Sequence, residues 1–207
     1  MSLPQLTHRT PAGTQDMARF PSLPEQPHLA DVFKRFGRGI WPLCEFHDVV
    51  LRGESEWSVA ERELMAAYVS GLNACQFCHG SHRMVAELHG VDAHVLEGLM
   101  DDVMPSRVGP RLAPVLAYLR KLTETPARMT DADAQAVFDE GVSEHALFDA
   151  ITICALFNFM NRIVEGCGVA HNEANMAVSR ARHLNNLDNP SPYREFARQL
   201  GLSPGSE

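Results

Sequence analysis

Apolar residues recur at helical spacing along most of the chain. Leu29, Val32, Phe33 and Phe36 lie at positions i, i+3, i+4 and i+7, which is the pattern of one apolar helical face. Similar patterns, with capping and turn residues between them, predict helices at about 29–37, 41–52, 59–72, 75–89, 92–100, 112–124, 131–140, 144–166, 169–184 and 193–199. We find no strand pattern, no repeat and no glycine-rich phosphate loop. The sequence therefore predicts an all-α fold.

Two of these helices are expected to form a hairpin. Ser58 and Glu61 form a capping box that opens the helix at 59–72. Gly71-Leu72-Asn73 supplies turn residues, and Gly90 is suited to end the helix at 75–89. Because the connection is so short, the two helices should run antiparallel about a turn at 72–73.

The expected helix at 144–166 is the most apolar of the chain, but polar residues interrupt it. We therefore expect a buried central helix, contributing also to an oligomer interface, rather than a membrane span. Its polar residues Asn158, Asn161 and Arg162 are expected to cap neighbouring helix ends rather than bind substrate. Residues 1–28 are rich in proline and show no helical period, so we expect an extended arm that hangs free or lies over a partner subunit. Residues 29–207 should form a single domain.

Composition narrows the function classes. The chain has 207 residues with a net charge of −8, which argues against nucleic acid or an anionic membrane as a partner. The polar N-terminal region has no apolar signal segment, so we expect a cytoplasmic protein. Five cysteines in a reducing compartment do not indicate a disulfide framework. We expect Cys44, Cys154 and Cys167 to be small buried apolar residues, His47 to lie at the surface, and His89 and His94 to be solvated or packed.

The densest chemistry lies in Cys75-Gln76-Phe77-Cys78-His79-Gly80-Ser81-His82. A CxxC pair can cycle between dithiol and disulfide. Cys75, Cys78, His79 and His82 could instead hold zinc, although ligands from one regular helix do not readily surround a tetrahedral ion. CxxCH is also the attachment pattern of c-type haem, which requires export or a dedicated lyase.

The hairpin adds a carboxylate to this stretch. Cys75, Cys78, His79 and His82 share a helical face, and folding about 72–73 places Glu63 opposite His82. A helix N-terminus favours a thiolate, and a carboxylate that orients a histidine beside a thiol can activate it. The sequence therefore predicts a site made of Glu63, Cys75, Cys78 and His82.

The pattern of Glu63, eleven residues, Cys75-x-x-Cys78 and His82 resembles the AhpD-like alkylhydroperoxidases of the carboxymuconolactone decarboxylase superfamily, and best its peroxidase-related branch. Arg62-Glu63-Leu64 and Phe157-Asn158-Phe159-Met160-Asn161-Arg162-Ile163 also look like family positions, and the resemblance covers about residues 30–170. The chain departs from the well-studied members at Phe77, where they carry a second histidine between the cysteines.

This resemblance implies an AhpD-like helical domain, built around the CxxC-bearing hairpin, that acts as a thiol-dependent hydroperoxidase or disulfide oxidoreductase. Cys78 would attack the peroxide, Cys75 would resolve the product, and Glu63 and His82 would relay the proton. The implied partners are a hydroperoxide substrate, a thiol or dithiol reductant protein and further copies of the chain, with no cofactor beyond the cysteine pair. The position of His82 also favours Cys78 as the attacking thiol, in contrast to the order in thioredoxin-like proteins.

Other functions remain open at this point. The cysteines could be inert in an oligomeric binding or assembly module on the same fold, and the CxxCHxxH stretch could bind zinc. A lyase activity of the carboxymuconolactone type is less favoured, because that relative does not depend on a CxxC pair.

Overall fold

The computed structural model describes residues 19–100 and 105–205. Within these residues the secondary structure is helical and contains no strand, which confirms the predicted all-α fold. The α-helices are α1 (Leu29–Arg35), α2 (Ile40–Arg52), α3 (Val59–Leu72), α4 (Gln76–Leu88), α5 (Ala93–Glu97), α6 (Pro105–Val108), α7 (Leu112–Glu124), α8 (Asp131–Phe138), α9 (Glu144–Cys167), α10 (Glu173–Leu184) and α11 (Pro192–Gln199). A single 3₁₀ turn, Pro126–Arg128, joins α7 to α8.

Two stretches differ from the sequence-based expectation. The predicted loop between residues 104 and 110 contains the short helix α6, and proline is well tolerated at its first position. Helix α10 begins at Glu173 instead of 169, because Asn172 caps it through the N–H of Asn175. The residues before α10 bond outside the helix, since the Ala170 N–H donates to the Pro27 carbonyl.

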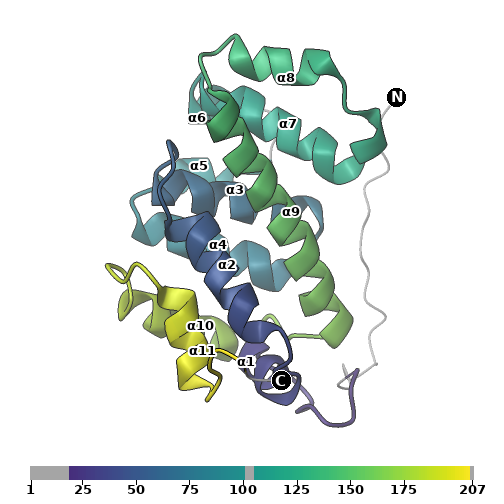
Figure 1. Cartoon of the computed structure of the whole chain (residues 1–207), viewed down its shortest axis with the longest axis vertical. Coiled ribbons are helices and arrows are strands. Elements are labelled where there is room, and N and C mark those ends of the chain that lie inside the picture. The colour runs from purple at the N-terminus through teal and green to yellow at the C-terminus, as the bar shows by residue number, and fades with distance from the viewer. Residues whose placement is uncertain (1–18, 101–104, 206–207) are drawn as a thin grey trace.

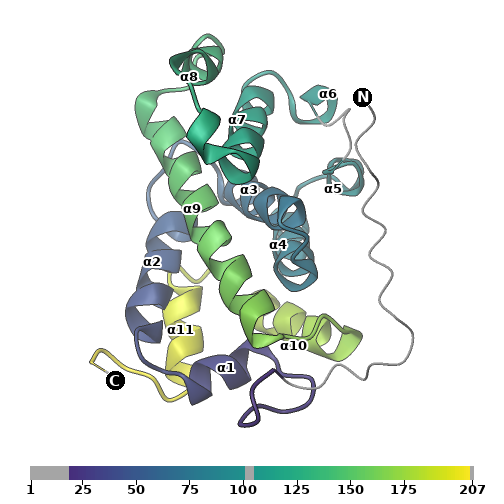
Figure 2. The same ribbon diagram turned by 90° about the vertical axis from the view of Figure 1, so that its right-hand side faces the viewer.

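Helix α9 crosses the molecule and organises its core (Figures 1 and 2). It packs against α3 and α4 on one side and α2 on the other, while α7 and α8 lie near its N-terminal end. Its length and composition would suffice for a membrane span, but half of its most apolar stretch is buried within the protein. This burial is what a core helix of a globular domain requires.

Helices α3 and α4 pack closely along their lengths, joined by residues 73–75. The Ser58–Glu61 capping box opens α3 as predicted. Because Gly71 has no side chain, His79 of α4 and Met100 can lie close to α3. A Cβ at this position would lie 3.0 Å from His79 Nδ1 and 2.5 Å from Met100 Sδ. Ala74, in the turn, has a φ of +55°, which is unusual for a residue with a side chain.

The polar residues of α9 hold the end of α3, as predicted. The C-cap residue Asn73 donates through its side-chain amide to Asn158 Oδ1 at 3.1 Å and to Asn161 Oδ1 at 2.9 Å. The Asn161 amide in turn donates to Ser70 Oγ at 3.0 Å. Arg162 donates to Asn158 Oδ1 from within the same helix. These bonds fix the turn that leads into the CxxC pair.

Helices α1, α10 and α11 cover the other end of α9 together with α2 (Figure 2). Buried Asp48 of α2 accepts hydrogen bonds from the backbone N–H groups of Tyr193 and Arg194, so α2 caps the start of α11 from far away in sequence. Residues 19–28, the described end of the predicted arm, lie against the same chain, with Leu23 buried in the core. The rest of that arm lies outside the described residues.

Candidate active site

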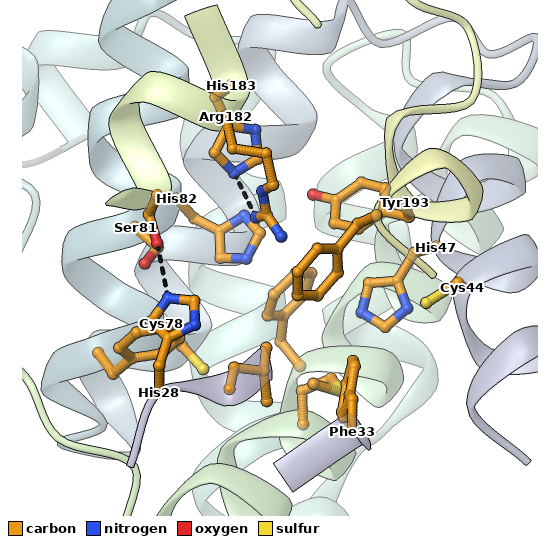
Figure 3. Close-up of a pocket in the computed structure, with 16 residues that line it drawn as sticks. His28, Phe33, Cys44, His47, Cys78, Ser81, His82, Arg182, His183 and Tyr193 are labelled. Atoms are coloured by element: carbon orange, nitrogen blue, oxygen red, sulfur yellow. Dashed lines mark hydrogen bonds between the residues drawn. The ribbon is translucent and has the colours of Figure 1, made fainter. Parts of the chain in front are cut away.

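A cavity of about 50 Å³ lies between α1, α2, α4, α9, α10 and α11. One water molecule needs roughly 10–15 Å³ of such a volume, so the cavity has room for a molecule of a few non-hydrogen atoms. Cys78 and His82 contribute to its wall from α4, and Phe157 and Met160 from α9 (Figure 3). The cavity can therefore bring a small molecule beside one of the two predicted redox cysteines.

The two cysteines of the CxxC pair occupy different positions at the start of α4. Cys75 is the N-cap residue and Cys78 lies in the first turn, as the sequence predicted. Cys78 borders the cavity, whereas Cys75 is fully buried away from it beside Phe77 and Val164. A molecule in the cavity can reach the sulfur of Cys78 but not that of Cys75.

The environment of Cys75 favours its protonated form. A hydrogen bond with Cys78 and burial both raise the pKa of the Cys75 thiol above its ordinary value. Desolvation and the neighbouring sulfur therefore act against the thiolate that a helix N-terminus was expected to favour, as far as Cys75 is concerned.

Glu63 joins α3 to the histidine of α4. The ring Nδ1 of His82 donates to Glu63 Oε2 at 2.6 Å, which is the contact that the hairpin geometry predicted. The His82 ring also packs edge-on against Phe157, with centroids 4.4 Å apart. Because Nδ1 is engaged by Glu63, Nε2 is the ring nitrogen left to exchange a proton with a small molecule.

Arg52, at the end of α2, is the charge partner of this carboxylate. The Arg52 Nη1 lies 2.6 Å from Glu63 Oε1, which makes an ion pair, while the N–H of this nitrogen donates its hydrogen bond to the Leu51 carbonyl. Burial alone would raise the pKa of the fully buried Glu63, but the charges of Arg52 and His82 outweigh it and hold this pKa below its ordinary value. Glu63 therefore stays ionised and holds the His82 ring in place.

His79 is not part of the cavity wall. Its Nδ1 lies 2.9 Å from the Ala67 carbonyl of α3, so the ring is directed between the two helices. In the described part of the chain, no three His, Cys, Asp or Glu side chains are placed to hold a metal ion. The alternative zinc set of Cys75, Cys78, His79 and His82 thus does not surround one point, because His79 and His82 are each engaged with α3.

The opposite wall of the cavity carries polar residues that the sequence analysis did not select: His47 from α2, Arg182 and His183 from α10, and Tyr193 from α11 (Figure 3). The expectation that His47 lies at the surface is wrong, since the residue is 5 % exposed. It lies three residues after Cys44 and four before Leu51, and this apolar spacing was a signal of burial.

The three other cysteines, all predicted to be buried, differ in their surroundings. Cys154 is buried in the core as expected, and Cys44 is buried at the cavity wall. Cys167 is only half-buried, because it ends α9. Arg52, Arg182 and Tyr193 had no comparable sequence signal, because each lies near a helix end and belongs to no recognised motif.

Comparison with known proteins gives the fold. No protein-family model and no curated protein matches the sequence. The structure is similar to an uncharacterized peroxidase-related protein from Silicibacter sp. TM1040, with 25 % identity and a TM-score of 0.61 over 70 % of this chain and 78 % of that one. It is also similar to an alkylhydroperoxidase AhpD core, an uncharacterized peroxidase-related protein from Ralstonia eutropha JMP134, with 19 % identity and a TM-score of 0.65 over 72 % of this chain and 79 % of that one. The chain therefore has the AhpD-like helical fold, and its predicted resemblance to the peroxidase-related proteins of that fold is confirmed.

Proposed function

We propose that this protein is a thiol-dependent hydroperoxidase in which Cys78 reacts with the peroxide and Cys75 resolves the product. The observation that carries the proposal is the unequal placement of the two sulfurs. Cys78 and His82 both border the cavity, whereas Cys75 is fully buried and does not line it. Of the two CxxC sulfurs, only that of Cys78 has both access to a small molecule and a proton acceptor at the same cavity wall.

The Glu63–His82 pair supports proton transfer at this sulfur. No direct hydrogen bond joins Cys78 and His82 among the described residues, and both line the same cavity. A peroxide oxygen or a water molecule between them would connect the thiol to His82 Nε2. The ionised Glu63 stabilises His82 after it has taken the proton, in the same way that a carboxylate supports other histidine bases.

The first chemical step transfers two electrons from sulfur to the peroxide. His82 removes the Cys78 proton, and the thiolate attacks the terminal oxygen of R–O–O–H. An S–O bond forms while the O–O bond breaks, and the leaving alkoxide takes the proton back from His82. The products are an alcohol and a Cys78 sulfenic acid.

The second step forms the disulfide. The Cys75 thiol attacks the sulfenic sulfur, an S–S bond forms, and the sulfenic oxygen leaves as water with the Cys75 proton. Residues three apart at a helix start can reach disulfide geometry after a modest rearrangement. A thiol or dithiol protein then supplies two electrons and two protons to restore both thiols, which defines the partner that we propose for this protein.

Mass spectrometry of single variants tests the assignment. After limiting ethyl hydroperoxide and dimedone labelling, Cys75→Ser should carry a sulfenic acid on Cys78, and Cys78→Ser should leave Cys75 largely unmodified. A label on Cys75 in the second variant would reverse the roles. If neither variant reacts faster than free cysteine, the protein is better described as a binding or assembly module on the same fold.

A further inference from the structure

An arginine without a carboxylate partner borders the cavity that holds Cys78. The guanidinium of Arg182 extends from α10 into the space between His82 and Tyr193 (Figure 3). Its Nη2 donates to His183 Nε2 at 2.9 Å, and its carbon lies 4.1 Å from the ring centroid of Phe196. Within residues 19–100 and 105–205, it makes no ion pair with an acidic side chain.

The charges around Arg182 leave one positive charge uncompensated. The negative charge that acts on Arg182 is that of Glu63, and this carboxylate is already paired with Arg52 and hydrogen-bonded to His82. His183 is neutral near pH 7, because burial and the charge of Arg182 lower its pKa to about 3. Burial likewise lowers the pKa of His47 to about 4. Arginine itself remains protonated in proteins, so the wall of the cavity carries a net cation.

A second hydrogen-bond donor faces the same space. The residue Tyr193 is 9 % exposed, and its buried hydroxyl has no hydrogen-bond partner. The hydroxyl points toward the Arg182 guanidinium (Figure 3). Burial raises the pKa of Tyr193, so the phenol stays a neutral donor. Asp48 fixes the backbone of Tyr193 at the start of α11 by accepting the hydrogen bond from its N–H.

We propose that Arg182 and Tyr193 form a subsite for the carboxylate of a small organic hydroperoxide, which places the peroxide group between Cys78 and His82. A guanidinium beside a phenol matches the acceptors of a carboxylate, and the anion would neutralise the cation on the cavity wall. A buried polar group left unpaired is costly, which explains why a ligand that pairs both donors would be preferred. The small cavity limits the substrate to a short carbon chain. This inference rests on the proposed peroxidase function, and it adds the class of substrate.

A matched pair of peroxides tests the preference. Hydroperoxyacetate and ethyl hydroperoxide share one skeleton and differ by a carboxylate in place of a methyl group. We expect the wild type to oxidise Cys78 faster with hydroperoxyacetate, and Arg182→Gln to lose about 10- to 100-fold with this substrate, as for a charged hydrogen bond. The rate of Arg182→Gln with ethyl hydroperoxide should lie within threefold of the wild-type rate with the same peroxide. Tyr193→Phe should lose several-fold with hydroperoxyacetate alone.

Arg180→Gln provides the matched control, because Arg180 lies on the same helix, is exposed, and loses the same charge. It should keep the wild-type ratio of the two rates. Two results would overturn the proposal: a wild type with no preference for hydroperoxyacetate, or an Arg182→Gln variant slowed equally with both peroxides. The second result would mean that Arg182 acts on the Cys78 thiolate and not on the substrate.

A binding measurement on the wild type keeps the test decisive if Arg182→Gln does not fold. Glycolate carries the carboxylate without the peroxide, and ethylene glycol is its neutral counterpart. Calorimetry with the reduced protein should detect glycolate and not ethylene glycol, and glycolate should inhibit oxidation by ethyl hydroperoxide competitively. Equal or absent binding of the two would refute the subsite. Selective glycolate binding in a protein that reduces neither peroxide would refute the proposed function and retain the subsite.

Discussion

Glu63→Gln is the change that most directly separates the Glu63–His82 pair from the rest of the site. Glutamine keeps the shape of the side chain and removes its charge. Arg52 then loses its buried partner, from which its Nη1 lies 2.6 Å away, and His82 loses the ionic acceptor that holds Nδ1 at 2.6 Å. We expect both the stability and the reactivity of Cys78 to fall.

The size of each effect follows from burial. Glu63 is fully buried, and removing one member of a buried ion pair costs about 3–5 kcal/mol. For a chain of this size, each kcal/mol lowers the Tm by roughly 2–4 °C, so we expect a decrease of about 6–20 °C. A positioned base contributes about 10²–10⁴-fold, and because the variant retains the His82 side chain and loses only its ionic acceptor, we expect a loss near 10²-fold in the rate of Cys78 oxidation.

The stability difference should also depend on pH. The folded pKa of Glu63 is held below its ordinary value of 4.5, so its ionised form contributes stability that is fully present above pH 4.5. This contribution is lost as the pH falls toward the folded pKa. The gap in stability between the wild type and Glu63→Gln should therefore be constant from pH 6 to 8 and should narrow below pH 4.5.

The assay is single-turnover oxidation of Cys78 in a Cys75→Ser background, with thermal unfolding of the same proteins. Glu61→Gln is the matched control, because Glu61 lies two residues away on α3 and glutamine can also complete the capping box. It should change the Tm and the rate little. An oxidation rate for Glu63→Gln within threefold of the wild type, in a folded protein, would refute the role of the Glu63–His82 pair.

Four further outcomes are expected. Burial lowers the folded pKa of His47 to about 4 from 6.5, so the stability that depends on its neutral form is fully present above pH 6.5. As the pH falls to 4, the wild type should lose about 3 kcal/mol of unfolding free energy relative to His47→Gln, measured by urea titration. Asn161→Leu should lower the free energy of unfolding by about 1–3 kcal/mol, since it removes the hydrogen bond to buried Ser70 and one of the acceptors of the Asn73 amide, and unchanged urea midpoints would contradict this. Ala74→Gly should stabilise the protein by about 1 kcal/mol, because its φ of +55° is strained for alanine; a lower Tm would be the opposing result. The chain should sediment as a homo-oligomer, because α9 leaves Phe148 and Phe159 exposed at 67 % and 50 %, and a clean 22.9 kDa species would exclude it.

Much of the helical framework follows from local signals in the sequence. The Ser58–Glu61 box, the turn before Cys75 and the glycine after α4 set helix ends that the structure reproduces within a few residues. These signals act between residues close in the chain, so the sequence contains them directly. For the same reason the facing of Glu63 and His82 could be predicted, since a short turn fixes the register of two antiparallel helices.

The cavity and its opposite wall depend on contacts between distant segments. Arg52 reaches Glu63 only because α2 ends beside α3, and Tyr193 reaches the cavity only because Asp48 caps α11 from α2, 145 residues earlier. No local pattern specifies such contacts, because they depend on how whole helices pack.

The CxxC pair depends on both local signals and distant contacts. The sequence by itself determined that Cys75 and Cys78 lie at the start of a helix, since turn and capping residues set that start. Only the tertiary structure decided which sulfur faces the cavity, because exposure depends on the helices that cover each side of α4. The packing of α9 and α10 around α4 leaves Cys78 at the cavity wall and buries Cys75, and this difference in access is the physical basis of their proposed roles.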